Sequence, residues 1–335
     1  MATREYSKRL GALTDEQLQA ALDRFELGQL VSAEPIANGL FGQNLVVTTT
    51  TGDYVFRGAP HWNPAGDDNW QFQKERFFSR LMHESDRGPN VPWPYLLEES
   101  RDIFGWGFAI QPRLGGGPLS LPLTAHYSEA ELRQQAAELG RALAAVHTVP
   151  VPSSGTHDPV TDSTRPFESS YADYVETTIE ELLAGSVAAS SATSPKDEAW
   201  ARSVMWEGRA AMQLPFQPVV VHLDFGHHNV LFEEHDGEWR ITGVIDWMTA
   251  EAGHPECDFA RPLATFQQYR IPGREEFLAA YRETHAETEG FGERLPVFIL
   301  WERMLIWNYW QRNNGFKEGL GMRTWMEPFV RSAVP

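Results

Sequence analysis

The sequence predicts an α+β protein in two parts, a small antiparallel sheet with one helix followed by a larger, mainly helical part. A chain of 335 residues exceeds the size at which one hydrophobic core keeps growing. Strand-like runs dominate residues 30–57, whereas helix formers dominate from residue 128 onward. Because the run Gly115-Gly116-Gly117-Pro118 interrupts the chain between them, we expect an N-terminal part at 1–114 and a C-terminal part at 115–335.

The N-terminal part opens with a helix-start signal at Thr14. Thr14 can cap the helix, Gln17 can complete a capping box, and Leu13 can pack against Leu18. The runs within 30–57 are rich in β-branched and aromatic residues and are separated by turn residues, which predicts three antiparallel strands.

Residues 69–84 carry a helical pattern, with an inner face made by Phe72, Phe77 or Phe78, and Leu81. Two further strands are expected near 95–97 and 107–111. The expected result is a small sheet with one helix across it.

The C-terminal part begins with strong helix formers over 128–147. The segments 150–166 and 186–197 are rich in Ser, Pro, Thr and Ala and are expected to be exposed loops. Short strand-like runs at 218–222 and 240–245 follow, and the chain then returns to helix. The last helices carry three tryptophans that are expected in the core: Trp301, Trp307 and Trp310.

Composition narrows the class of partner. Lys and Arg total 28 against 46 Asp and Glu, and the formal net charge of −18 disfavours nucleic acid and anionic membranes. The same charge would attract a cationic substrate, although solubility alone also explains an acidic surface. There is no apolar run long enough to span a bilayer, and the single Cys257 cannot form an internal disulfide. We therefore expect a cytoplasmic protein.

One segment contains the candidate catalytic residues. VVVHLDFGHHNVLF holds His222, Asp224 and Asn229 in the spacing H-x-D-x-x-x-x-N, and Asp246 follows Asn229 by seventeen residues. Phosphoryl transfer needs a carboxylate near the acceptor hydroxyl and oxygen ligands for Mg²⁺. Asp224 alone would be an ordinary turn residue. With Asn229 and Asp246 as metal ligands, the pattern predicts a small-molecule kinase that uses Asp224 as base.

The segment resembles the aminoglycoside phosphotransferases and related kinases with a protein-kinase-like fold. HLDFGHHNVLF is similar to their catalytic loop, IDW to their metal-binding motif, and GHPECDFA to the element that follows. Within the family, the likeness is greatest to hygromycin B phosphotransferases. The resemblance implies a bilobal kinase-like fold in which Asp258 braces the catalytic loop and His222 supports it. It is strong over 218–262, weaker over 30–147 and fades over 276–335.

The same resemblance implies nucleotide-binding roles in the N-terminal part. The loop over the phosphates would be ANGLFGQ, where Gly39 and Gly42 allow backbone to approach phosphate. Arg57 would be the cation and Glu75 its partner on a helix. Each has a structural alternative, since Gly-x-x-Gly occurs in many turns, and Arg57 and Glu75 could both be solvated surface charges.

The hinge, by position, is 110–114, where backbone groups of Gln111 and Arg113 could bond the purine of ATP or GTP. Two departures from the family pattern stand out. Arg57 replaces the usual lysine, and a guanidinium is bulkier and bidentate. His254 replaces the usual aspartate after Gly253. Neither departure affects the expected base or metal ligands.

His222, Asp224, His227 and His228 also suggest a hydrolytic metal cluster. Adjacent histidines point in different directions, however, and this interpretation leaves the spacing from Asn229 to Asp246 unexplained.

For the acceptor we expect a cationic aminoglycoside such as hygromycin B, with antibiotic resistance as the biological role. Glu302 is a candidate for binding its ammonium groups, or else a solvated helix charge. Two rivals stay open. One is a kinase of another alcohol, such as a macrolide, a choline-like compound or a sugar, and the other is a nucleotide-binding regulator without catalysis.

Overall fold

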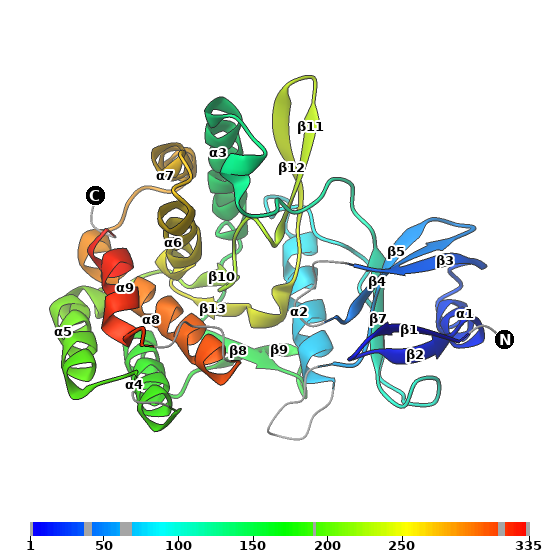
Figure 1. Cartoon of the computed structure of the whole chain (residues 1–335), viewed down its shortest axis with the longest axis horizontal. Helices are drawn as coiled ribbons and strands as arrows, with labels where there is room; N and C mark the ends of the chain where they lie inside the picture. Colours follow the sequence, from blue (N-terminus) through cyan, green and yellow to red (C-terminus); the bar gives the residue numbers. More distant parts are fainter. Residues whose placement is uncertain (1–2, 37–41, 61–68, 190–191, 314–318, 333–335) are drawn as a thin grey trace.

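A computed structural model of the chain describes residues 3–36, 42–60, 69–189, 192–313 and 319–332. Figure 1 shows an antiparallel sheet toward the N-terminus, a mainly helical body toward the C-terminus, and helix α2 standing between them. The predicted α+β class is therefore confirmed. Within the described ranges, no helix has both the length and the apolar character that crossing a membrane requires.

The N-terminal sheet has the strand order β3-β4-β5-β7-β6, and all neighbouring strands are antiparallel. Along β4, every second side chain is buried, as expected for a strand with one face on a core. The strands predicted within 30–57 and near 95–97 and 107–111 all form. Their bounds are β3 (Leu30–Pro35), β4 (Asn44–Thr49), β5 (Asp53–Arg57), β6 (Leu96–Glu98) and β7 (Phe108–Pro112).

The predicted first helix is α1 (Asp15–Asp23), and its capping box is present. Thr14 Oγ1 accepts from the Gln17 N–H at 3.2 Å, and Gln17 Oε1 accepts from the Thr14 N–H at 3.0 Å. A hairpin of β1 (Thr3–Ser7) and β2 (Gly11–Thr14) precedes the helix and was not predicted. The residues of β1 are mostly polar and show no strand pattern in the sequence. The strand therefore depends on its pairing with β2.

Helix α2 (Trp70–Glu84) connects the two parts of the molecule. Phe72 near its start packs with Ala109 of β7 and with Tyr95, the residue before β6. Phe77 and Phe78 are both buried and belong to the large hydrophobic core of the C-terminal part. One helix thus contributes to both cores, and the predicted inner face is confirmed.

The C-terminal body is built around α8, which packs against α4, α5 and α9. Trp301 and Trp307 of α8 are buried as predicted, but Trp310 is 37% exposed. The helices are α3 (Glu129–Val146), α4 (Tyr171–Ala189), α5 (Pro195–Met212), α6 (Ala260–Tyr269), α7 (Arg274–Arg282), α8 (Phe291–Arg312) and α9 (Met322–Arg331), with 3-10 turns η1 (Leu123–Ala125), η2 (Trp247–Thr249) and η3 (Pro255–Phe259).

A second sheet has the order β10-β13-β8-β9, and a separate hairpin joins β11 to β12. The strand-like runs predicted at 218–222 and 240–245 correspond to β10 and β12. The bounds are β8 (Gly155–Asp158), β9 (Ser163–Pro166), β10 (Val219–Val221), β11 (Val230–His235), β12 (Glu238–Val244) and β13 (Glu251–Gly253).

Two loop predictions were wrong. The segment 150–166 contains β8 and β9, because Gly155 pairs with Ala252 of β13, a partner far away in the sequence. The segment 186–197 is helical at both ends, since α4 continues to Ala189 and α5 begins at Pro195. Alanines extend the first helix, and Ser194 caps the second.

Candidate active site

The loop between β10 and β11 is held by the carboxylate of Asp258 in η3. Asp258 Oδ2 accepts from the His222 N–H at 2.7 Å, and Oδ1 accepts from the Leu223 N–H at 2.6 Å. Leu223 has φ +61°, a left-handed conformation that is uncommon for leucine. The two hydrogen bonds therefore fix the backbone just before Asp224.

His147, the C-cap residue of α3, contacts Asp258, and the sequence did not reveal this contact. His147 Nε2 lies 3.2 Å from Asp258 Oδ2, and Nδ1 lies 2.8 Å from the Tyr281 hydroxyl. Burial lowers the pKa of His147. The neutral imidazole can donate to Asp258 and accept from Tyr281.

His222 ties this loop to the segment that contains Asp246. Its Nε2 donates to the Ile245 carbonyl at 2.9 Å, and the Ile245 N–H donates to the Asn229 carbonyl at 2.9 Å. Thr249 Oγ1 donates to the His222 carbonyl at 2.8 Å. The hairpin β11–β12 therefore returns Asp246 alongside Asn229. Asp246, at φ +67°, is also left-handed.

Asp224 is surrounded by donors. Asn229 Nδ2 donates to Asp224 Oδ2 at 3.1 Å, and His228 Nε2 lies 3.2 Å from Oδ1. Arg261 Nη2 lies 3.0 Å from the same Oδ1. Burial alone would raise the pKa of Asp224, but Arg261 and His228 hold it below its ordinary value. The carboxylate is therefore ionised near neutral pH and can accept a hydrogen bond from an alcohol.

Asn229 and Asp246 present oxygens from two adjacent segments. The Asn229 amide nitrogen points to Asp224, so its amide oxygen is directed elsewhere. One carboxylate and one amide oxygen fit Mg²⁺, which commonly takes few protein ligands and completes its shell with phosphates and water. In the part of the chain that is described, His, Cys, Asp and Glu form no group of three that could hold a metal ion.

Arg57, at the end of β5, lies between Glu75 of α2 and Asp246. Arg57 Nη2 is 2.9 Å from Glu75 Oε1 and 3.4 Å from Asp246 Oδ1. Glu75 Oε2 accepts from the Tyr95 hydroxyl at 2.7 Å. Burial raises the pKa of Glu75 to about 7, against the opposing effect of Arg57. Arg57 Nε is buried and has no hydrogen-bond partner among the described residues, so the guanidinium can still take an anionic partner.

The structure describes only some of the other residues that the sequence predicted to bind the nucleotide. Gly39 lies outside the described residues. Gly42 has φ +61°, and an added Cβ would meet Ser7 Cβ at 3.0 Å, which favours glycine here. Gln111 is buried in β7, paired with Val55. The Arg113 N–H donates to the Asp53 carbonyl at 3.0 Å. This donor is engaged by the sheet and is not free for a purine.

Glu302 is neither a solvated charge nor an open carboxylate. It is 5% exposed and contacts two guanidinium groups, with Arg261 Nε 2.9 Å from Oε1 and Arg303 Nη2 donating to Oε1 at 2.7 Å. Burial opposes ionisation, but Arg303 and Arg261 hold the pKa of Glu302 below its ordinary value. The side chain links Arg261 to the core of the C-terminal part, and its charge is already compensated.

Arg261 is a second residue that sequence reasoning missed, because the fold alone brings it into contact with Asp224 and Glu302. The one available signal was its position directly after the GHPECDFA element.

His227 does not join a metal cluster. Its ring is buried and stacks on Phe232 at 6.2 Å, whereas His228 is exposed and faces Asp224. Burial, with His228, lowers the pKa of His227 to about 3. The hydrolytic interpretation therefore has no geometric support among the described residues.

The phosphotransferase enzyme family APH matches residues 32–291 of the chain. Comparison with curated protein sequences gives no match. A solved structure of a thermostable mutant of aminoglycoside phosphotransferase APH(4)-Ia, in its apo form, is similar with a TM-score of 0.67 and 19% identity, covering 95% of this chain and 99% of that chain.

Two further structures have the same fold. A ternary complex of an APH(4)-Ia mutant with AMP-PNP and hygromycin B has a TM-score of 0.66 and 19% identity, covering 93% of this chain and 97% of that chain. The GDP complex of wild-type aminoglycoside 2'-phosphotransferase-IIIa has a TM-score of 0.63 and 14% identity, covering 98% of each chain. These likenesses confirm the predicted kinase-like fold.

Proposed function

The chain belongs to the phosphotransferase enzyme family APH and is a small-molecule kinase, and from that premise we propose that it transfers the γ-phosphoryl group of ATP or GTP to a hydroxyl of a cationic aminoglycoside such as hygromycin B. The observation that carries the proposal is the convergence of Asp224, Asn229 and Asp246, which hydrogen bonds through His222 and Ile245 bring together. This arrangement is what phosphoryl transfer requires.

Asp224 acts as the base. The acceptor hydroxyl oxygen attacks the γ-phosphorus, the bond to the β-phosphate oxygen breaks, and the hydroxyl proton passes to the Asp224 carboxylate while the nucleoside diphosphate leaves. Arg261 and His228 keep Asp224 ionised and orient it. Asp258 acts through the backbone of His222 and Leu223 as a positioning residue.

Asn229 and Asp246 would hold Mg²⁺, which when bound neutralises charge on the phosphate oxygens. Arg57 contacts the nonreacting phosphates through its unpartnered Nε, and Glu75 orients the guanidinium. Gly39 and Gly42 belong to the phosphate loop, and Gln111 offers backbone groups to the purine. The AMP-PNP and GDP in two structural neighbours support a nucleotide donor of either kind.

The nucleotide lies between an N-terminal lobe at 1–114 and a C-terminal lobe at 115–335. The net charge of −18 supports a cationic acceptor and no nucleic-acid or membrane partner. The only cysteine, Cys257, is a buried free thiol, which supports the cytoplasm as location. Phosphorylation of an aminoglycoside there would give antibiotic resistance.

A kinase of another alcohol is the second candidate. It is favoured by the pairing of Glu302 with Arg261 and Arg303, because the acid expected to bind ammonium groups is already compensated. Macrolide, choline-like and sugar acceptors belong to this candidate.

Product formation by the purified chain separates these functions. With Mg²⁺ and ATP or GTP, hygromycin B and other aminoglycosides are compared with a macrolide, choline and simple sugars by mass spectrometry. Phosphorylated aminoglycoside is the expected product. Turnover with another acceptor alone would show that the chain is a kinase with a different substrate. Nucleotide binding without any turnover would favour a nucleotide-binding regulator without catalysis.

A further inference from the structure

The hairpin of β1 and β2 lies outside the part of the chain that matches the family, since the match begins within β3. The hairpin nevertheless contacts the chain before and at the end of the proposed phosphate loop, 37–43. Arg4 Nη1 donates to the carbonyl of Ala33 in β3, the strand before the loop, at 3.2 Å. Ser7 Oγ donates to the carbonyl of Gly42, near the end of the loop, at 2.6 Å.

Ser7 connects the turn of the hairpin to the loop. Its Oγ donates to the Gly42 carbonyl and also accepts from the Leu10 N–H at 3.0 Å, so one hydroxyl satisfies two backbone groups. A Cβ added to Gly42 would meet Ser7 Cβ at 3.0 Å, so the hairpin approaches the loop closely. Because a peptide group is planar, holding the Gly42 carbonyl also fixes the direction of the Gln43 N–H.

Arg9, in the turn between β1 and β2, holds the segment that follows Arg57. Arg9 Nε donates to the Ala59 carbonyl at 2.7 Å, and Nη2 donates to the Pro60 carbonyl at 3.0 Å. Ala59 has φ +46°, a left-handed conformation that is uncommon for alanine. The hairpin therefore fixes the backbone two residues after Arg57.

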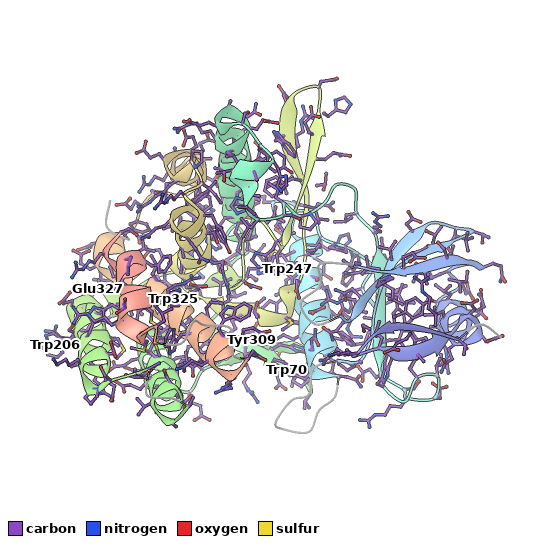
Figure 2. All side chains as sticks on the ribbon, in the orientation of Figure 1. Trp70, Trp206, Trp247, Tyr309, Trp325 and Glu327 are labelled. Carbon is purple, nitrogen blue, oxygen red and sulfur yellow. The ribbon has the colours of Figure 1, made fainter. Side chains whose placement is uncertain are left out.

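Gln43, the last residue of the proposed loop, joins these contacts to helix α2. It is 3% exposed, and its Nε2 donates to the same Ala59 carbonyl at 3.0 Å. Gln43 Nε2 also lies 3.2 Å from Gln71 Oε1. Gln71 follows Trp70, which Figure 2 shows at the start of α2. A buried amide that is hydrogen-bonded in this way is held in one orientation.

The hydrogen bonds continue from Gln71 to the proposed phosphate-binding cation. Gln71 Nε2 donates to Glu75 Oε1 at 3.2 Å, and the same Oε1 lies 2.9 Å from Arg57 Nη2. The loop and the cation are therefore both connected to the hairpin, the loop through Ser7 and the cation through the contacts that begin at Arg9.

We propose that the hairpin of β1 and β2 positions the phosphate-binding groups of the nucleotide site, with Ser7 and Arg9 as positioning residues. The proposal rests on the proposed nucleotide-binding function of this site and adds the hairpin to it. The two side chains act through the backbone of Gly42 and Ala59. They restrict the loop and the segment after Arg57 before the nucleotide arrives. A preorganised site loses less conformational entropy on binding, so the hairpin raises nucleotide affinity.

Calorimetric binding to the full chain with Mg²⁺ tests the proposal, with AMP-PNP and GMP-PNP as probes. We expect Ser7→Ala and Arg9→Met each to weaken binding of the better probe about 5-fold, because each removes hydrogen bonds that order the site before binding. Ser100→Ala is the matched control and should bind like wild type. Ser100 is an exposed serine of the same N-terminal part, and its hydroxyl donates to Asp102 Oδ1 at 2.6 Å.

Hydrogen exchange of the nucleotide-free chain distinguishes positioning from a general loss of stability. In both variants, amide exchange should become faster in the hairpin and over 42–60, and should stay unchanged in α8 of the C-terminal body. The Gly58 N–H, which donates to the Gln43 carbonyl at 2.9 Å, reports directly on this segment.

The outcomes distinguish the hairpin from the nucleotide site. Wild-type affinity in both variants, while wild type binds a probe, would reject the positioning role and leave the nucleotide site intact. Faster exchange throughout the chain would also overturn the proposal, because the hairpin would then only stabilise the fold. If wild type binds neither probe, the proposed nucleotide function fails and the role of the hairpin fails with it.

Discussion

At the scale of single residues, Asp258 determines the backbone of the loop that carries Asp224. Its two oxygens satisfy two consecutive N–H groups, one of them on the left-handed Leu223. A buried carboxylate that accepts backbone N–H bonds and contacts His147 cannot be replaced without leaving a polar group unpaired.

We therefore expect Asp258→Asn to lower the free energy of unfolding by about 2–4 kcal/mol. Turnover should fall at least about tenfold, because Asp224, the proposed base, is displaced. Urea unfolding and steady-state kinetics measure both effects. Asp236→Asn is the control, since Asp236 is a left-handed, 88% exposed turn residue where Asn is tolerated. Equal stability of the two variants would contradict this role of Asp258.

His254 makes stability depend on pH. Burial, with repulsion from Arg294, lowers its pKa to about 3, whereas an unfolded histidine titrates near 6.5. Below about pH 6.5 the unfolded chain therefore binds the extra proton, and stability falls as pH falls. Between pH 6.5 and 4.5 this residue should account for up to about 2.7 kcal/mol of lost stability.

Asn at position 254 keeps an acceptor for the Glu256 N–H but has no titratable group. The unfolding free energy of His254→Asn should thus fall less steeply with acid than that of wild type. Chemical unfolding at several pH values measures the difference in slope, and identical slopes would remove His254 from the explanation.

At the scale of elements, the sequence predicted the helices and strands whose residues show a local sequence pattern. The β-branched run of β4, the capping box of α1 and the apolar face of α2 are local, and each element formed as expected. Strands β8 and β9 depend on pairing with β13, which no local pattern reveals. The contacts of Arg261 and Glu302 were hidden for the same reason, because their partners are brought together only by packing.

Helix α2 depends on the buried pair of Glu75 and Arg57. Removing Glu75 takes away the closer of the two carboxylates that contact the buried Arg57 and leaves Asp246 at 3.4 Å, so Glu75→Ala should cost about 3–5 kcal/mol of stability. It should also raise the KM for nucleotide at least about tenfold, because the guanidinium is no longer oriented. Glu84→Ala, at the exposed end of the same helix, is the control. An unchanged nucleotide KM in Glu75→Ala would rule out the orienting role.

At the scale of the whole molecule, the net charge of −18 would act with opposite signs on the proposed cationic acceptor and on the nucleotide. A cationic acceptor is attracted and an anionic nucleotide is repelled over a Debye length. The chemistry of the site and the electrostatic field of the whole chain should therefore contribute separately to kcat/KM, and the two contributions can be measured apart.

Raising the salt concentration from 20 mM to 500 mM should lower kcat/KM for a cationic aminoglycoside by about tenfold, since screening removes the attraction. The value for the nucleotide should stay level or rise, which provides an internal control. Steady-state kinetics at fixed Mg²⁺ measures both. The same salt response for the two substrates would show that the field does not steer the acceptor.

The most direct test of the central claim compares phosphoryl transfer by wild type and Asp224→Asn, using the acceptor that wild type phosphorylates. The amide keeps the size of the side chain but cannot take the hydroxyl proton, so the rate should fall by about 10²–10⁴-fold while nucleotide affinity is retained. Transfer at the wild-type rate by Asp224→Asn would contradict the assignment of Asp224 as the base.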